Sequence, residues 1–322
     1  MAYYIVMQFV IKCKLLLKNI LKLGGKQMKK LLALVLALCM IFALAACGQA
    51  AAPAPAATEA PVEEVPVEEA PVEEAPEPVE VIVFAAASMT ETLTEVADMY
   101  MAANPNVTIT MNFDSSGTLK TQIQEGADCD VFISAGQKQM NQLDIEASPD
   151  VNTEGLDFVD TPTRVNFLEN KVVLVVPESN PKGLSSFDDL ADGLKEGTLL
   201  FCMGNEDVPV GQYTQQILEY YELDEAALAS AGTITYGSNV KEVTTQVTEA
   251  AVDAGVVYCT DAFSAGLSPV AYATKDMCKQ IIYPAAVMKN APQHEAAQAF
   301  LDYCFTDEAM AVFTAVGFEK VA

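Results

Sequence analysis

The stretch "VIVFAAASMTET", residues 81–92, joins a strand pattern to a helix pattern. Branched and aromatic apolar residues run into three alanines, and Ser88 then opens a segment with helical character. Ser88 followed three residues later by Glu91 fits a capping box, in which the serine oxygen accepts a hydrogen bond from a free amide of the first turn. An isolated motif of this kind favours the capping role. The alternative is that Ser88 and the helix amides behind it face a bound anion.

Beyond this stretch, apolar runs typical of buried strands alternate with helix patterns through residues 81–322. Three further strand-to-helix junctions are "DSSGTL" (114–119), "VPVGQY" (208–213) and "GSNVKE" (237–242). Such alternation predicts an α/β protein with mostly parallel sheets and helices on both faces. A segment of this length is large enough for two lobes with a ligand cleft between them.

The four junctions share an unusual composition. Each has Ser, Asn, Pro or Gly at the start of its helix, and none places a basic side chain at the turn itself. Taken singly, each is an ordinary helix start. The carboxyl ends of parallel strands are, however, where ligands bind in such sheets, and each helix N-terminus carries about half a positive charge. Together the junctions predict an uncharged hydrogen-bonding site for one dianion.

The N-terminal segment has the pattern of an export signal. "MKKLLALVLALCMIFALAAC" (28–47) combines two lysines, a short apolar stretch and small residues, and its end resembles the lipobox of bacterial lipoproteins. We therefore interpret residues 1–46 as a signal segment, with residues 1–27 as an over-extended start, and Cys47 as the lipidated first residue of the mature protein. A plain signal peptide with an incidental cysteine is the alternative.

Residues 47–80 are interpreted as a lipidated cysteine followed by a tether. A repeating Pro-Val-Glu-Glu unit fills this segment, which contains no basic residue. Alternating proline forbids a regular helix, and like charges repel, so the chain is expected to extend over roughly 100 Å. An anchor followed by such a spacer would hold the folded part at the extracellular face of the cell membrane.

Composition excludes several function classes. The formal net charge of −26 argues against binding nucleic acid or docking on anionic lipid. With one histidine, one arginine and no tryptophan, the chain is poorly equipped for a histidine-rich zinc site, an arginine clamp or a tryptophan sugar platform. Five cysteines of the folded part have no close spacing and are expected mostly as small core residues rather than as a disulfide framework: Cys129, Cys202, Cys259, Cys278 and Cys304.

Several of these segments resemble the molybdate-binding proteins of ABC importers, a branch of the type II periplasmic binding proteins. The resemblance rests on "VFAAASMTETL", "FDSSGTLKTQIQEGADCDVFISAGQKQMNQL", "GNEDVPVGQY", "SNVKEV", "GVVYCTDA" and "YPAAVMK", and covers essentially all of residues 81–322. It implies a two-lobed type II periplasmic-binding-protein-like fold. Two apolar runs, "KVVLVVP" and "IIYPAAV", would carry the chain across the hinge and back. We expect lobe I to comprise residues 81–170 plus 280–322, and lobe II residues 171–279.

The same resemblance implies the ligand and the residues that hold it. In that family two serines, backbone amides and a tyrosine hydroxyl bind the oxyanion, and by motif these are Ser88, Ser116, the amides of Val210 and Val240, and Tyr258. Val210 stands where the family usually has alanine. The implied ligand is molybdate or tungstate, with molybdenum present only within the oxyanion and no free metal cation or cofactor. The implied partners are the permease and ATPase subunits of an ABC importer, and the protein is expected to be a monomer.

Three alternatives remain open at this stage. Sulfate is also a tetrahedral dianion, whereas hydrogen phosphate carries a proton that a donor-only site would leave unsatisfied. A binding protein for a small organic solute would need a carboxylate clamp, and Arg164 does not lie at a strand-to-helix junction. An enzyme with a hydrolase triad would need His294, which the pattern places in the first turn of an exposed helix. We expect no catalytic residue.

Overall fold

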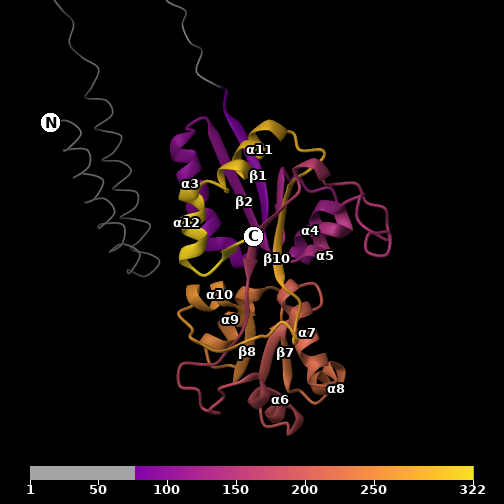
Figure 1. The fold of residues 1–322 in the computed structure, drawn as a ribbon, viewed down its shortest axis with the longest axis vertical. Coiled ribbons are helices and arrows are strands. Elements are labelled where there is room, and N and C mark those ends of the chain that lie inside the picture. Colours follow the sequence, from indigo (N-terminus) through magenta and orange to yellow (C-terminus); the bar gives the residue numbers. More distant parts are fainter. Residues whose placement is uncertain (1–76, 322) are drawn as a thin grey trace, which may run out of the picture. The chain divides into compact units, whose positions relative to one another are not determined.

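The computed structural model describes residues 77–321, which form two β-sheets with their covering helices (Figure 1). The predicted signal segment, Cys47 and the tether up to residue 76 lie outside the described residues. The first strand begins at Val79, so it includes the last two residues of the expected tether.

The first sheet has six strands in the order β11-β4-β10-β3-β1-β2. Its strands are β1 (Val79–Ala86), β2 (Val107–Asp114), β3 (Val131–Ile133), β4 (Val165–Asn170), β10 (Ile281–Val287) and β11 (Glu319–Lys320). Its helices are η1 (Ala87–Met89), α3 (Thr90–Ala103), α4 (Ser116–Gln124), α5 (Gln137–Leu143), η2 (Thr161–Thr163), α11 (His294–Tyr303) and α12 (Asp307–Ala315). Helices α3 and α12 lie on one side of the sheet, and α4 and α5 lie on the other (Figure 1). We call this sheet with its helices the six-stranded half.

The second sheet has five strands in the order β7-β6-β8-β5-β9. Its strands are β5 (Val172–Val175), β6 (Phe201–Gly204), β7 (Ile234–Gly237), β8 (Ala254–Tyr258) and β9 (Pro269–Tyr272). Its helices are α6 (Phe187–Lys195), α7 (Pro209–Tyr220), α8 (Glu225–Ser230), α9 (Val240–Thr248) and α10 (Cys259–Ser264). We call this sheet with its helices the five-stranded half.

The chain passes between the two halves twice. It leaves the six-stranded half between β4 and β5, where only Lys171 separates the two strands, and it returns between β9 and β10. The strands of the six-stranded half therefore come from both ends of the folded chain, and those of the five-stranded half from its middle. The exact lobe boundaries, 170/171 and 279/280, remain our proposal.

The α/β fold class expected from the sequence is confirmed, but the sheets are mixed rather than mostly parallel. Strand β1 pairs in parallel with β2 and β3, and β6 pairs in parallel with β7 and β8. The connecting strands are antiparallel to their neighbours: β10 to β3 and β4, and β5 to β8 and β9. These strands carry the chain out of one half and back, so they run against the strands that alternate with helices.

The strands that form the cores read as continuous apolar runs because both faces of each sheet are covered. All four residues of β5 and all five of β8 are buried. The five cysteines within residues 77–321 are free thiols; four are buried and Cys259 is partly exposed. Within the same residues, none of the helices combines the length and the apolar character that a membrane crossing requires.

Candidate functional site

The five residues expected to bind an oxyanion line one small cavity of about 10 Å³. Its walls come from both halves and lie at the carboxyl ends of β1, β2, β3, β6, β7 and β8, which are the strands with parallel neighbours. The lining residues are Ala86, Ala87, Ser88, Asp114, Ser115, Ser116, Ala135, Val208, Pro209, Val210, Val240 and Tyr258. None of them is basic, so any anion held here is bound by hydrogen bonds and helix dipoles.

Ser116 has a hydroxyl that is free to donate into the cavity. The capping role in α4 falls to Ser115, whose side chain accepts from the Thr118 amide at 3.1 Å. Ser116 is fully buried, and its Oγ accepts from the Ala135 amide at 2.9 Å. A hydroxyl has one donor and two acceptor sites, so this bond leaves the Ser116 proton for a ligand.

Ser88 does not cap a helix, and the capping-box expectation is wrong. The 3₁₀ turn η1 comes between β1 and α3, so α3 begins only at Thr90 and its N-cap residue is Met89, with no side-chain capping bond. The Ser88 hydroxyl lies instead 2.9 Å from the Tyr283 hydroxyl. The inserted turn moves Ser88 out of capping register and leaves it buried at the cavity wall.

The amides of Val210 and Val240 lie at helix N-termini. Val210 is the second residue of α7 and Val240 the first of α9. The first four amides of an α-helix have no partner within the helix, so both are available as donors. Asn239 caps α9 through the Glu242 amide at 3.2 Å. This cap fixes the first turn and holds the Val240 amide at the cavity.

Two buried tyrosines meet behind the cavity. The Tyr258 hydroxyl, at the end of β8, donates to the Ala135 carbonyl at 3.3 Å. Burial raises the pKa of Tyr258 well above its usual range, so its hydroxyl stays a neutral donor. Tyr283 of β10 packs against Tyr258, and its hydroxyl accepts from Asn170 Nδ2 at 3.2 Å. Sequence reasoning did not single out Tyr283, although it opens the quoted segment "YPAAVMK".

An acidic side chain also lines the cavity, which corrects the expectation of an uncharged, donor-only site. Asp114 ends β2, and its Oδ1 accepts from the Ser115 amide at 2.7 Å and from Asn239 Nδ2 at 3.4 Å. The carboxylate therefore lies between the two halves, next to the start of α9. Its charge disfavours a fully ionised ligand, and its oxygens can accept a proton from a partly protonated one.

Several bonds across the cavity show that the two halves are closed on each other. The Gly117 amide in the first turn of α4 donates to the Asp207 carbonyl at 3.1 Å. The Asn239–Asp114 and Tyr258–Ala135 bonds cross the same boundary. Because a cavity this small has little room beyond that of a water molecule, entry of any larger ligand requires the halves to separate.

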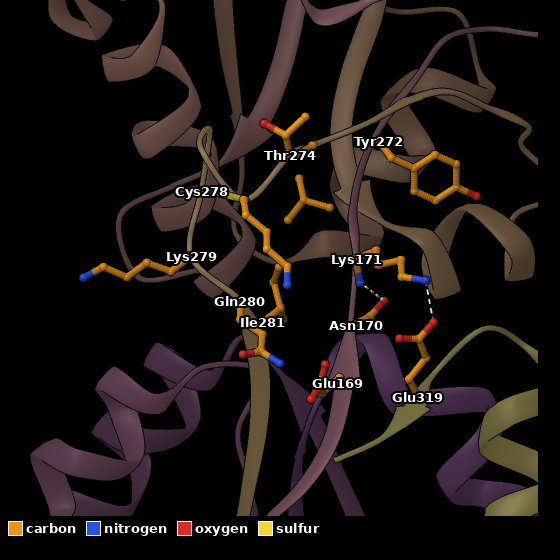
Figure 2. Close-up of a pocket in the computed structure, with 13 residues that line it drawn as sticks. Glu169, Asn170, Lys171, Tyr272, Thr274, Cys278, Lys279, Gln280, Ile281 and Glu319 are labelled. Atoms are coloured by element: carbon orange, nitrogen blue, oxygen red, sulfur yellow. Dashed lines mark hydrogen bonds and ion pairs between the residues drawn. The ribbon is translucent and has the colours of Figure 1, made fainter. Parts of the chain in front are cut away.

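A larger pocket of about 620 Å³ lies at the crossings between the halves (Figure 2) and shares no lining residue with the predicted site. Residues from both crossings line it, including Glu169, Lys171, Thr274, Lys279 and Glu319, and Lys171 pairs with Glu319. None of the five expected ligand residues reaches this pocket. Residues 77–321 hold no group of three or more histidine, cysteine or acidic side chains placed to bind a metal ion.

The residues required by the alternative functions lie outside the cavity. His294 starts α11, and its Nε2 is 2.8 Å from Asp160 Oδ2 on a partly exposed surface. Arg164 binds Asp144 at 2.6 Å and also contacts Gln137 and Asn141, so it ties α5 to the start of β4. Neither side chain is placed to act on a ligand between the halves.

Comparisons with known proteins identify the family of the chain. Residues 81–319 match the family described as bacterial extracellular solute-binding protein. YvgL of Bacillus subtilis, provisionally named as an ABC transporter substrate-binding lipoprotein, is 34% identical over 242 residues, which cover 74% of this chain and 86% of YvgL. The molybdate-binding protein ModA of Haemophilus influenzae is 32% identical over 248 residues, which cover 74% of this chain and 89% of ModA.

A solved structure shows the same fold. The periplasmic molybdate-binding protein of Azotobacter vinelandii superimposes with a TM-score of 0.62 at 21% identity, over 75% of this chain and all of that one. With these relatives, the chain is a substrate-binding component of an ABC transporter and not an enzyme. The family match spans both sheets and every wall of the cavity, and on this basis the chain belongs to the bacterial extracellular solute-binding proteins.

Proposed function

We propose that the cavity binds molybdate or tungstate and that the protein delivers this oxyanion to the permease and ATPase subunits of an ABC importer. The observation that carries the proposal is the convergence of Ser88, Ser116, Tyr258 and the amides of Val210 and Val240 on one cavity without a basic side chain. A fully ionised tetrahedral oxyanion accepts hydrogen bonds on every side, which suits this set of donors.

The energetics of such a site permit tight binding. A hydrogen bond to a charged group contributes about 1.5–3 kcal/mol, so five such donors give a gross gain of roughly 7–15 kcal/mol. From this gain is subtracted the bond to the Ala135 carbonyl, which Tyr258 gives up to reach the ligand. Closure of the two halves and loss of ligand freedom offset part of this gain. A dissociation constant in the micromolar range or below is therefore expected.

The size of the cavity supports a small inorganic ligand. Sites for drug-sized organic molecules have volumes of roughly 300–1,000 Å³. With the halves closed, the cavity measures about 10 Å³. A five-atom oxyanion requires a small separation of the walls, whereas an amino acid or a sugar would require a much larger one. The name of the Haemophilus influenzae relative points to molybdate in particular.

We also propose that Cys47 anchors the protein to the outer face of the cell membrane. The lipobox-like pattern and the acidic spacer motivate this proposal, and the relative from Bacillus subtilis carries lipoprotein in its name. Labelled fatty acid should be incorporated by the wild type and not by Cys47→Ala. Equal labelling of the two proteins would show that Cys47 is not the site of lipid attachment.

The carboxylate of Asp114 makes hydrogen phosphate the second candidate, because a protonated oxyanion needs an acceptor. The experiment that separates the candidates is a titration of wild type and Asp114→Asn with molybdate and with phosphate. Asparagine keeps the shape and an acceptor oxygen but removes the negative charge. If molybdate is the ligand, the variant should bind it about three- to tenfold more tightly, because a like charge near the dianion is lost.

The opposite pattern would identify phosphate, and not molybdate, as the ligand. If the wild type binds phosphate more tightly than molybdate and Asp114→Asn loses the phosphate affinity, the site is built for a protonated oxyanion. Sulfate, titrated in parallel, tests selection by size among the fully ionised tetrahedral anions, because it has the charge of molybdate in a smaller volume.

A further inference from the structure

Three charged side chains form a cluster beside the cavity: Glu91, Lys241 and Asp261. Lys241 Nζ lies 2.9 and 2.7 Å from the two carboxylate oxygens of Glu91 and 3.7 Å from Asp261 Oδ1. Glu91 lies in the first turn of α3, in the six-stranded half. Lys241 in α9 and Asp261 in α10 belong to the five-stranded half. The Glu91–Lys241 pair therefore joins the two halves.

Each member of the cluster follows a cavity residue closely in the chain. Glu91 is three residues after Ser88, Lys241 directly follows Val240, and Asp261 is three residues after Tyr258. A movement that separates Glu91 from Lys241 thus also separates the Ser88 wall of the cavity from the Val240 wall. The ion pair and the ligand site open together.

Asp261 is an unusual counter-charge for Lys241. Its side chain is fully buried, and among the described residues neither carboxylate oxygen has a hydrogen-bond partner. Burial raises the pKa of Asp261 to about 7, with Lys241 opposing the rise and Glu91 adding to it. The other titratable groups that interact with this carboxylate are Tyr258, Tyr283 and Cys259.

We propose that Glu91 and Lys241 are positioning residues for oxyanion binding, whose ion pair holds the two halves closed, and that the buried Asp261 beside Lys241 makes this closure sensitive to pH. This inference rests on the proposed function of the cavity. Lys241 acts through closure and not as a charge on the ligand, because it is already paired with Glu91 and does not line the cavity.

The cluster links closure to pH near neutrality. When the halves separate, Glu91 moves away, and the loss of its negative charge lowers the pKa of Asp261 below its closed-state value of about 7. The closed state therefore binds the proton more tightly than the open state. Its advantage is complete below the open-state pKa and is lost as the pH rises through about 7. Ligand affinity should fall over the same range, by at most about tenfold per pH unit.

The sign of the effect of Glu91→Gln tests the proposal. If the pair holds the halves closed, the variant should release molybdate faster and bind it about three- to tenfold more weakly, consistent with a partly exposed ion pair. If Lys241 instead attracts the anion directly, removal of the competing Glu91 charge should tighten binding, and the proposal fails. Lys241→Arg should retain most of the affinity, whereas Lys241→Met should resemble Glu91→Gln.

A matched control is available within the six-stranded half. Asp157 and Lys289 form an ion pair that is similarly exposed but does not join the halves. Asp157→Asn should bind and release molybdate as the wild type does. An equal loss in Asp157→Asn and Glu91→Gln would show a general effect of charge and would overturn the proposal.

The pH dependence of molybdate affinity distinguishes the proposed role of Asp261 from a purely structural one, because a structural role would leave this dependence unchanged. Titrations between pH 6 and 8 should show the wild-type affinity falling with pH, and Asp261→Asn should flatten the profile because its amide does not titrate. A flat wild-type profile, or an unchanged slope in Asp261→Asn, contradicts the link to Asp261. Glu91→Gln changes only an exposed side chain, so the release experiment does not depend on how well Asp261→Asn folds.

Failure of the proposed function can be told apart from failure of this inference. A wild type that binds neither molybdate nor tungstate refutes the function of the cavity. The positioning role is then measured without ligand, from distances between spin labels on the two halves. Glu91→Gln should reduce the closed population relative to Asp157→Asn, and equal distance distributions in the two variants would overturn the inference.

Discussion

Gly117→Ala is expected to lose about a hundredfold in molybdate affinity while the free energy of unfolding stays the same or rises. A Cβ at Gly117 would lie 2.3 Å from the carbonyl oxygen and 2.7 Å from the Cβ of Asp207. Asp207 belongs to the opposite half, so the clash arises only on closure. Overpacking of this kind costs about 1–3 kcal/mol. At the upper end of this range, the cost to the closed state corresponds to roughly a hundredfold loss of affinity. Alanine is favoured over glycine within a helix by about 1 kcal/mol.

Gly211→Ala is the matched control. The added Cβ would lie 2.3 Å from the Gly204 carbonyl oxygen and 2.4 Å from that of Asn205, both in the same half as Gly211. This clash is present whether the halves are open or closed, so the variant should unfold at a lower temperature. Calorimetric titration with molybdate and thermal unfolding of both variants check the contrast. Wild-type affinity in Gly117→Ala would show that ligand binding does not need the closed contact.

Ser88→Ala is expected to weaken molybdate binding by about ten- to a hundredfold, because a charge-assisted hydrogen bond of roughly 1.5–3 kcal/mol is lost. No helix cap is lost, because Ser88 caps no helix. The buried Tyr283 hydroxyl keeps the bond from Asn170 but loses the acceptor for its own proton, which costs about 1–3 kcal/mol of stability.

Ser116→Ala provides the comparison. It should lose a similar share of affinity and of stability, because the buried Ala135 amide is left without its acceptor, at a cost of about 1–3 kcal/mol. Calorimetric titration with molybdate and thermal unfolding measure the affinity and the stability of both serine variants. Molybdate affinity equal to wild type in both would mean that the serines do not contact the ligand.

The sequence predicted that the strand-to-helix junctions lie together, because each junction is recognised from a short stretch of neighbouring residues. Each junction combines a buried strand with a helix start, and parallel strands end at one edge of a sheet. Residues near 88, 116, 210 and 240 were therefore expected together, and the family resemblance added Tyr258; the structure places all five on one cavity. Their role as ligands remains a prediction that the variants above test.

The details that the sequence missed depend on contacts between distant segments. The role of Ser88 changed because a single 3₁₀ turn precedes α3, and the spacing of apolar residues does not reveal such a turn. Tyr283 reaches Ser88 from 195 positions along the chain. Glu91 pairs with Lys241 across 150 positions, and only the packing of the two halves brings them together.

The same limit explains the sheets. Strand β4, "VNFLEN", mixes polar and apolar residues and was not recognised as a strand, yet it lies between β10 and β11. The antiparallel pairings follow from where the chain leaves and re-enters the six-stranded half. The direction of these strands is set by the topology of the whole chain, so no short stretch of sequence predicts it.

A thermal-unfolding screen of the wild-type protein tests the proposed function most directly. At a ligand concentration one hundred times its dissociation constant, binding stabilises the folded state by about 2.7 kcal/mol. For a folded segment of this size, such a gain raises Tm by about 5–10 °C. We predict this shift with molybdate and tungstate, a smaller one with sulfate or phosphate, and none with glutamate or maltose. A shift with glutamate or maltose alone, or a larger shift with phosphate than with molybdate, would contradict the assignment.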